Sequence, residues 1–161
     1  MASYSVHYKF SQLFDFPPQA AYKWCTDFQT GDVVLMGKKG DRQIRRINED
    51  TLVLDDTYFG EGGKTVKKRL IRLYPERLAW TNTRISAEGK FSQFLYEIFP
   101  DGENGSRLDF TGSQIFYSSD KPSAAKIASI SDELRNEDAA GWKLLAEAMK
   151  KDLYKPGPAQ S

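Results

Sequence analysis

The feature that most constrains the fold is a succession of short strand-like runs, each closed by turn residues. Six runs rich in β-branched and aromatic residues follow one another, at residues 42–47, 51–59, 64–74, 77–86, 90–99 and 106–118. The segments between them are short and rich in Gly, Asn, Asp and Pro. Connections this short join antiparallel neighbours, so the six runs predict an antiparallel meander.

The region before this meander predicts one more strand and two short helices. Residues 4–16 alternate loosely and read as a long first strand. Pro17 and Pro18 end that strand and begin a helix, because proline is tolerated in the first helical turn. Its apolar residues, which include Trp24 and Cys25, recur at helical spacing, and Gly31 separates it from a short apolar segment at residues 33–36. The sheet therefore has about seven strands.

The region after Pro122 has a helical pattern that continues to about Tyr154. Its apolar stripe holds Trp142, Leu145 and Met149, and Asp138 and Gly141 continue it toward the N-terminus. A glycine in mid-helix is unfavourable by roughly 1 kcal/mol relative to alanine, so Gly141 indicates close packing. Residues 131–133 could cap a break, which leaves one kinked helix or two helices open. We expect one domain over residues 1–154 and a flexible tail at 155–161.

Neither the net charge nor the hydropathy of the sequence indicates binding to nucleic acid or insertion into a membrane. Lys and Arg number 23 against 22 Asp and Glu, a net charge of +1, so there is no overall attraction to nucleic acid or to an anionic membrane. No apolar stretch approaches the roughly 18 residues of a spanning helix, which predicts no stable membrane insertion. A cytoplasmic protein, either a monomer or a homodimer, is the simplest interpretation.

Three local patterns carry a resemblance to a known superfamily. Residues 14–24 join a strand to a proline-started helix, residues 96–108 form a hairpin around Pro100-Asp101-Gly102, and Gly141-Trp142 opens the last helical turns. In this order they resemble the SRPBCC superfamily, which includes START domains, birch-pollen-allergen-like proteins, polyketide cyclases and chaperone activators. The resemblance implies an α+β helix-grip fold: a curved antiparallel sheet wrapped around a long C-terminal helix. It does not select a function, since the superfamily hosts carriers, enzymes and protein-binding modules.

Hairpin pairing predicts which side chains face the concave side of this sheet. If Pro100 pairs with Ser106, then Tyr96 meets Phe110, and the large apolar residues of the hairpin share one face while Glu97 and Asp109 lie on the other. The same counting through the earlier turns places polar residues among the apolar ones. The predicted ligand-binding residues are Asp56, Tyr58, Lys67, Arg69, Trp80, Asn82, Phe94, Tyr96, Phe110, Trp142, Leu145 and Met149, with Arg84 and Gln114 as further polar candidates.

This set has the composition of a ligand pocket, which is mostly apolar with a few convergent polar groups. In this interpretation Arg69 and Asn82 hold the polar end of the ligand. A plainer interpretation keeps Asp56 and Lys67 as an ion pair at the rim, where such pairs contribute little. The helical stripe through Trp142 is likewise explained by core packing alone.

No catalytic or metal motif can be assembled from the remaining residues. His7 is the only histidine, which excludes a histidine metal cluster and a Ser-His-Asp triad. Cys25, the only cysteine, lies on an apolar helix face and reads as a core residue. Gly63-Lys64-Thr65 lacks the earlier glycine of a phosphate loop and joins two strands. We therefore predict no metal and no cofactor.

The sequence favours a protein that binds or carries a hydrophobic or amphipathic small molecule, of the lipid, polyketide or isoprenoid class, in an internal cavity. One alternative is a cyclase, dehydratase or hydrolase, with Asp56, Tyr58, Arg69 and Tyr96 as candidates for proton transfer. Another is a protein-interaction module of the chaperone-activator kind, with an exposed apolar patch around Leu70, Tyr74 and Leu95 on the outer sheet face.

Overall fold

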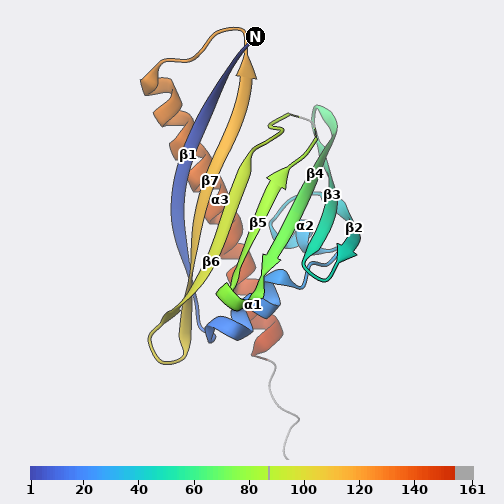
Figure 1. Cartoon of the computed structure of the whole chain (residues 1–161), viewed down its shortest axis with the longest axis vertical. Coiled ribbons are helices and arrows are strands. Elements are labelled where there is room, and N and C mark those ends of the chain that lie inside the picture. The colour runs from blue at the N-terminus through green and yellow to red at the C-terminus, as the bar shows by residue number, and fades with distance from the viewer. Residues whose placement is uncertain (87, 155–161) are drawn as a thin grey trace, which may run out of the picture.

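A computed structural model of the chain describes residues 1–86 and 88–154. Within them, one antiparallel sheet has the strand order β1-β7-β6-β5-β4-β3-β2 (Figure 1). Its strands are β1 (Ala2–Phe14), β2 (Gly40–Asn48), β3 (Thr51–Gly60), β4 (Gly63–Tyr74), β5 (Ala79–Arg84), β6 (Gln93–Asp101) and β7 (Gly105–Ser118). The predicted meander is therefore confirmed, and β1 joins it by pairing with the last strand. The predicted tail at 155–161 lies outside the described residues.

The helices occupy the predicted places. α1 (Pro18–Thr26) begins at a proline, and α2 (Asp32–Leu35) follows it after a short connection. The C-terminal region, left open between one helix and two, is the single helix α3 (Ala124–Leu153), capped by the Ser123 hydroxyl, which accepts a hydrogen bond from the Lys126 amide at 3.1 Å. The Ser131 hydroxyl donates to the His7 carbonyl of the edge strand β1 at 2.8 Å. Ser131 thus ties the continuous helix to the sheet.

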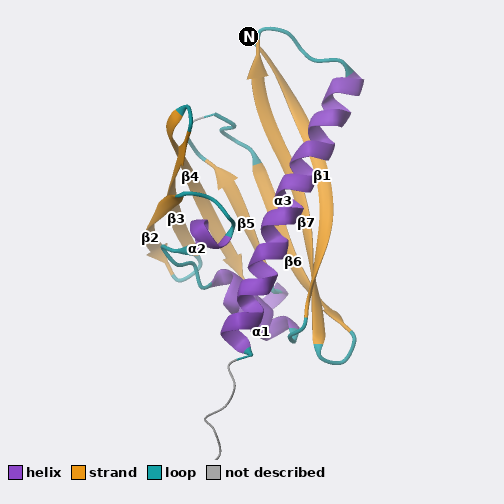
Figure 2. Cartoon of the chain, turned by 180° about the vertical axis from the view of Figure 1, so that it is seen from behind, coloured by secondary structure: helices purple, strands orange, loops and turns teal. Residues whose placement is uncertain are grey.

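α3 runs across the concave face of the curved sheet (Figure 2), which gives the predicted helix-grip arrangement. Trp142, Leu145 and Met149 point from α3 into the core, where they meet aromatic residues of β5 and β6. Gly141 is buried, and a Cβ placed on it would lie 3.2 Å from the methyl group of Met36, just after α2. The predicted close packing at Gly141 is therefore confirmed.

Some element boundaries differ from the prediction for local conformational reasons. β5 begins at Ala79 and not at residue 77, because Pro75–Arg77 form a 3-10 turn, η1, and Leu78 takes a left-handed conformation with φ 50°. β6 begins at Gln93, after Phe91, which has φ 74°. Left-handed residues cannot continue a strand, so both strands are shorter than their patterns suggested.

The strand register agrees with the hairpin counting. Pro100 pairs with Ser106 and Tyr96 with Phe110 across β6 and β7. Trp80 pairs with Tyr96 across β5 and β6, and Asp56 pairs with Lys67 across β3 and β4. The predicted inner-face residues of these strands therefore share the concave side, and Arg107 and Asp109 form an ion pair of 2.8 Å on the opposite side.

Candidate ligand-binding cavity

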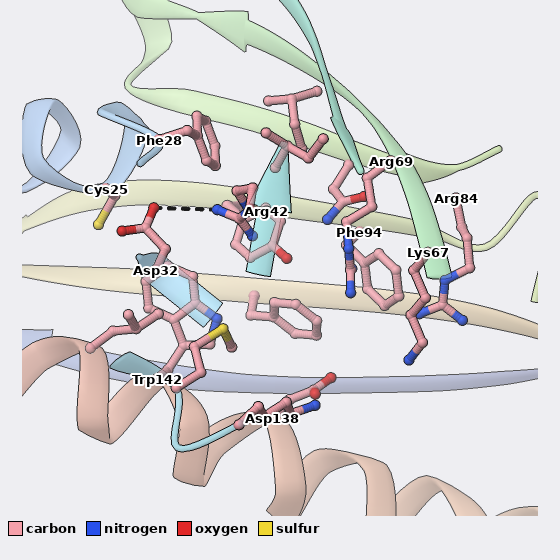
Figure 3. A pocket seen from close by; sticks show the side chains of 18 of the residues that line it. Cys25, Phe28, Asp32, Arg42, Lys67, Arg69, Arg84, Phe94, Asp138 and Trp142 are labelled. Carbon is pink, nitrogen blue, oxygen red and sulfur yellow. Dashed lines mark hydrogen bonds and ion pairs between the residues drawn. The ribbon is translucent and has the colours of Figure 1, made fainter. Parts of the chain in front are cut away.

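A cavity of about 450 Å³ lies between the concave face of the sheet and the helices (Figure 3). Ten of the twelve predicted residues line it. The two others are Asp56, which lies behind the wall, and Met149, which is fully buried in the core. α1, α2 and their connections complete the lining with residues that the strand counting could not reach, among them Phe28, Asp32 and Met36.

One part of the cavity wall is aromatic. Trp80 of β5 and Tyr96 of β6 stack with their ring centroids 4.7 Å apart and their planes almost parallel. Trp142 of α3 lies 5.6 Å from the Tyr96 ring, and Phe94 lies 5.8 Å from Phe110. These contacts are within the range of favourable aromatic pairs, so this part of the wall is a packed aromatic surface.

A buried ion cluster lies in the wall at β2, β3 and β4. The carboxylate of Asp56, which is 0% exposed, accepts hydrogen bonds from Arg42 at 2.6 and 3.0 Å. Its second oxygen lies 3.2 Å from Nε of Arg69 and accepts a hydrogen bond from the Tyr58 hydroxyl at 3.3 Å. Arg69 in turn donates to the Tyr58 oxygen at 3.1 Å. Burial by itself lowers the pKa of the Arg69 guanidinium. Tyr58 and Asp56 raise this pKa by more than burial lowers it, so the net shift is upward.

This cluster corrects the interpretation of Asp56 and Lys67 as a pair at the rim. The two residues are cross-strand partners, but the ion-pair partners of Asp56 are Arg42 and Arg69, and its carboxylate is fully buried. Arg42, which the sequence did not single out for the site, also lies 3.3 Å from Asp32 of α2, the contact drawn in Figure 3. The charge of Arg69 is therefore paired within the protein, although its Nε makes no hydrogen bond among the described residues, and this pairing weakens the reason for assigning Arg69 to a ligand.

A second pair of cationic side chains lies at another part of the wall. Lys67 of β4 and Arg84 of β5 both line the cavity, and neither has a carboxylate within 4 Å in the described part of the chain. Burial, followed by the charges of Arg84, Arg69 and Lys38, lowers the pKa of Lys67 to about 8. Burial and Arg69 also lower the pKa of Arg84. The protein thus holds two unneutralised cations against the cavity, and both are electrostatically strained.

A third polar group joins β1 and β7 to α3. The Tyr8 hydroxyl donates a hydrogen bond to Asp138, and the amide of Gln114 donates to the Tyr8 oxygen at 2.9 Å. Burial raises the pKa of the Asp138 carboxyl, and burial together with Asp138 raises that of Tyr8. Asp138 and Gln114 line the cavity. The signal for Asp138 was present in the sequence, as an acidic residue on the apolar stripe of the helix.

Asn82 is another polar residue aimed at the cavity. It is 6% exposed, and its side-chain oxygen has no hydrogen-bond partner among the described residues. A buried amide oxygen without a partner is unfavourable by roughly 1–3 kcal/mol. Asn82 therefore remains a candidate for contact with a polar ligand group.

The residues rejected as catalytic have positions consistent with that rejection. His7 is exposed on β1, and its side chain alternates with the inward-facing Val6 and Tyr8. Burial raises the pKa of the Cys25 thiol, which disfavours the reactive thiolate. In residues 1–86 and 88–154 no group of His, Cys, Asp and Glu has the arrangement of a metal site, and none of the helices there is long and apolar enough to cross a membrane.

Comparison with known proteins identifies the fold. No family model matches the chain, and no curated protein matches its sequence. The Zhui aromatase/cyclase from Streptomyces sp. R1128 superposes with a TM-score of 0.79 at 10% identity, over 97% of this chain and 100% of that one. Ara h 8.0201 gives 0.71 at 12% identity over 92% and 99% of the two chains. Norcoclaurine synthase from Thalictrum flavum gives 0.69 at 11% identity over 97% and 98%. The chain therefore has the helix-grip fold that these three structures share.

Proposed function

We propose that this helix-grip domain binds and carries a hydrophobic or amphipathic small molecule in its internal cavity. The observation that carries the proposal is the combination, in one cavity, of a stacked aromatic wall with buried polar atoms that lack partners in the protein. Packing alone does not account for Oδ1 of Asn82 and Nε of Arg84, which are buried without a hydrogen-bond partner among the described residues. A ligand with an apolar body and a polar end satisfies both parts.

The volume of the cavity and the fold support the same function. Ligand pockets typically enclose roughly 300–1,000 Å³, and the cavity of about 450 Å³ lies within that range. Structures of the same fold include aromatase/cyclases and a norcoclaurine synthase in complex with dopamine and hydroxybenzaldehyde. Those ligands belong to that protein, but they support the use of this scaffold to bind small molecules.

The test is a binding screen with a variant that fills the cavity. Native mass spectrometry and thermal shift would be run with fatty acids, fatty alcohols, isoprenoid alcohols and aromatic polyketides. Leu145 lines the cavity from α3, whereas its neighbour Leu144 is exposed on the same helix. We expect Leu145→Trp to weaken binding at least tenfold and Leu144→Trp to leave it unchanged. Failure of every ligand class to bind the wild-type chain would overturn the proposal.

A reaction on the bound molecule is a second candidate, favoured by the Tyr8–Asp138 contact. A carboxyl group with a raised pKa on a cavity wall is suited to proton transfer. Asp56, by contrast, is fully buried behind the wall. The test is hydrogen–deuterium exchange at the α-carbon of a bound 1,3-diketone, followed by NMR. We expect the wild type to accelerate this exchange and Asp138→Asn to abolish the acceleration. The control is Asp132→Asn, on the exposed side of α3, which should exchange as fast as the wild type.

The protein-interaction alternative stays a prediction. Of its three residues, Tyr74 is 40% exposed, while Leu70 and Leu95 are half-buried.

A further inference from the structure

We propose that Lys67 and Arg84 form an anion subsite, which binds the carboxylate head of an amphipathic ligand whose apolar body lies along the aromatic wall. This inference rests on the proposed function and specifies the charge of its ligand. It differs from the sequence interpretation, in which Arg69 and Asn82 held the polar end.

The position of Arg84 is fixed by its surroundings, and those surroundings leave its charge unpaired. The residue is 8% exposed, and its guanidinium lies over the Phe94 ring at 5.9 Å from the centroid. A Cβ on Gly89 would lie 2.4 Å from Nη1 of Arg84, so the absence of a side chain at Gly89 makes room for the guanidinium. Nη1 has a long hydrogen bond of 3.5 Å to the Glu88 carbonyl, and Nε has no partner among the described residues. A buried cation held in this way is ready for an anion.

Lys67 supplies the second charge from the neighbouring strand. Its side chain extends from β4 into the cavity toward the side formed by α3, at the same end as Arg84 (Figure 3). Its amine lies 5.3 Å from the centroid of the Tyr58 ring. Two like charges that interact across a low-dielectric wall repel one another, and an anion between them removes that repulsion. A carboxylate has the two acceptor oxygens needed to bind an ammonium and a guanidinium together.

The chemistry of Lys67 gives the subsite a dependence on pH. Its pKa of about 8 means that the amine is charged at neutral pH and loses its proton just above it. A bound carboxylate favours the charged amine and must therefore raise this pKa, so binding near pH 8 takes up protons. Arg84 stays charged throughout. The charged and titratable groups around the amine are Arg69 on its own strand, Asp56 and Tyr58 on β3, Arg84 on β5, Lys38 after α2 and Glu137 on α3.

The experiment compares an acid with an alcohol of the same chain length. N-phenyl-1-naphthylamine, an uncharged fluorescent probe, would report on the cavity, and dodecanoate and dodecanol would displace it. The variants are Lys67→Met and Arg84→Met. The matched control is Lys68→Met, because Lys68 lies next to Lys67 on the outer face, 3.7 Å from Asp55. Proton uptake would be measured by calorimetry at pH 8 in buffers of different ionisation enthalpy.

We expect wild type to bind dodecanoate about tenfold or more tightly than dodecanol at pH 7, as charge-assisted hydrogen bonds allow. Each cavity variant should remove most of this preference while leaving dodecanol affinity within about twofold, and Lys68→Met should behave as wild type. Lys67→Met should also abolish proton uptake. Equal binding of acid and alcohol, or an unchanged preference in both cavity variants, would overturn the anion subsite alone. If neither compound nor the probe binds wild type, the proposed function fails with it.

Discussion

Two groups of cationic side chains face the same cavity, and they differ in what neutralises them. In the first, called here the paired cluster, Arg42 and Arg69 surround the buried carboxylate of Asp56, with the Tyr58 hydroxyl between. In the second, called here the cation pair, Lys67 and Arg84 have no carboxylate within ion-pair distance among the described residues. The two groups are built on adjacent strands of one sheet.

The difference separates a structural role from a binding role. Opposite charges that pair with one another inside the protein hold the strands together and are less available to a ligand. Two charges of the same sign, one buried and one half-buried, do the opposite: they lower the stability of the empty protein and are compensated only when an anion binds. Residue type alone does not reveal this, because both groups consist of cations on the concave face.

The largest expected effect comes from removing the centre of the paired cluster. Asp56→Ala leaves the buried guanidinium of Arg69 without a counter-ion and leaves Arg42 only the contact of 3.3 Å with Asp32, which should lower the free energy of unfolding by about 3–5 kcal/mol. The matched control is Asp55→Ala, because Asp55 pairs at 3.7 Å with Lys68 on the outer face and should lose less than about 1 kcal/mol. Urea titration followed by circular dichroism measures both. Equal losses in the two variants would show that the cluster is not a structural unit.

The sequence predicted the face of Asp56 but not its main partner, and the reason is a bulge. Counting back from Asn48 opposite Thr51 with an uninterrupted register would set Gln43 opposite Asp56. The structure has an irregularity between Arg46 and Asn48, which shifts the pairing by one residue and brings Arg42 to that position. Since a one-residue shift also exchanges the two faces, Arg42 could not be assigned to the cavity from turn lengths.

Other parts of the site depended on how separate elements dock. Strand counting placed Trp80, Tyr96 and Phe110 on the concave face because regular hairpins fix the side-chain period. Tyr8 and Asp138 are 130 residues apart and meet only because α3 packs against β1. Local patterns carry no information about such a contact. The unpaired state of Lys67 and Arg84 could not be predicted either, since it depends on the position of every acidic side chain in the folded structure.

The same substitution in the two groups should have opposite effects. Arg42→Met removes a bidentate partner of Asp56 and should lower the free energy of unfolding by about 3 kcal/mol. Arg84→Met replaces an unpaired buried cation with an apolar side chain of similar length, and should raise it by about 1–2 kcal/mol in ligand-free protein. Chemical denaturation of protein refolded from denaturant, and so freed of bound lipid, measures both. A destabilised Arg84→Met would mean that the contacts of Arg84 within the protein outweigh the cost of its buried charge, and Arg84 would then not be an unsatisfied cation.

The cation pair should also make stability depend on alkaline pH. Because the pKa of Lys67 is lowered to about 8, the folded chain loses this proton between pH 8 and 10, where the unfolded chain still holds it. The unfolded state then binds more protons, so the contribution of Lys67 to the free energy of unfolding rises with pH in this window and is lowest below pH 8. Between pH 8 and pH 10 we expect the free energy of unfolding of the wild type to rise by on the order of 1 kcal/mol relative to that of Lys67→Met, after allowance for solvent screening. The measurement is the free energy of unfolding of both proteins as a function of pH. If the two values changed in parallel, a strained amine at Lys67 would be excluded.

The smallest effect comes from the one residue that belongs to both groups. The hydroxyl of Tyr58 joins Arg69 to Asp56, whereas its ring lies beneath the Lys67 amine. Tyr58→Phe removes the hydroxyl and keeps the ring, so it should lower the free energy of unfolding by about 0.5–1 kcal/mol and leave the alkaline dependence assigned to Lys67 unchanged. Tyr58→Leu removes both, and should in addition change that dependence, because the cation then loses its contact with the ring. The two variants, compared by denaturation at pH 7 and pH 9.5, test whether the groups are independent. If Tyr58→Phe alone altered the alkaline dependence, the hydroxyl would couple the groups and the division between a structural cluster and a binding pair would fail.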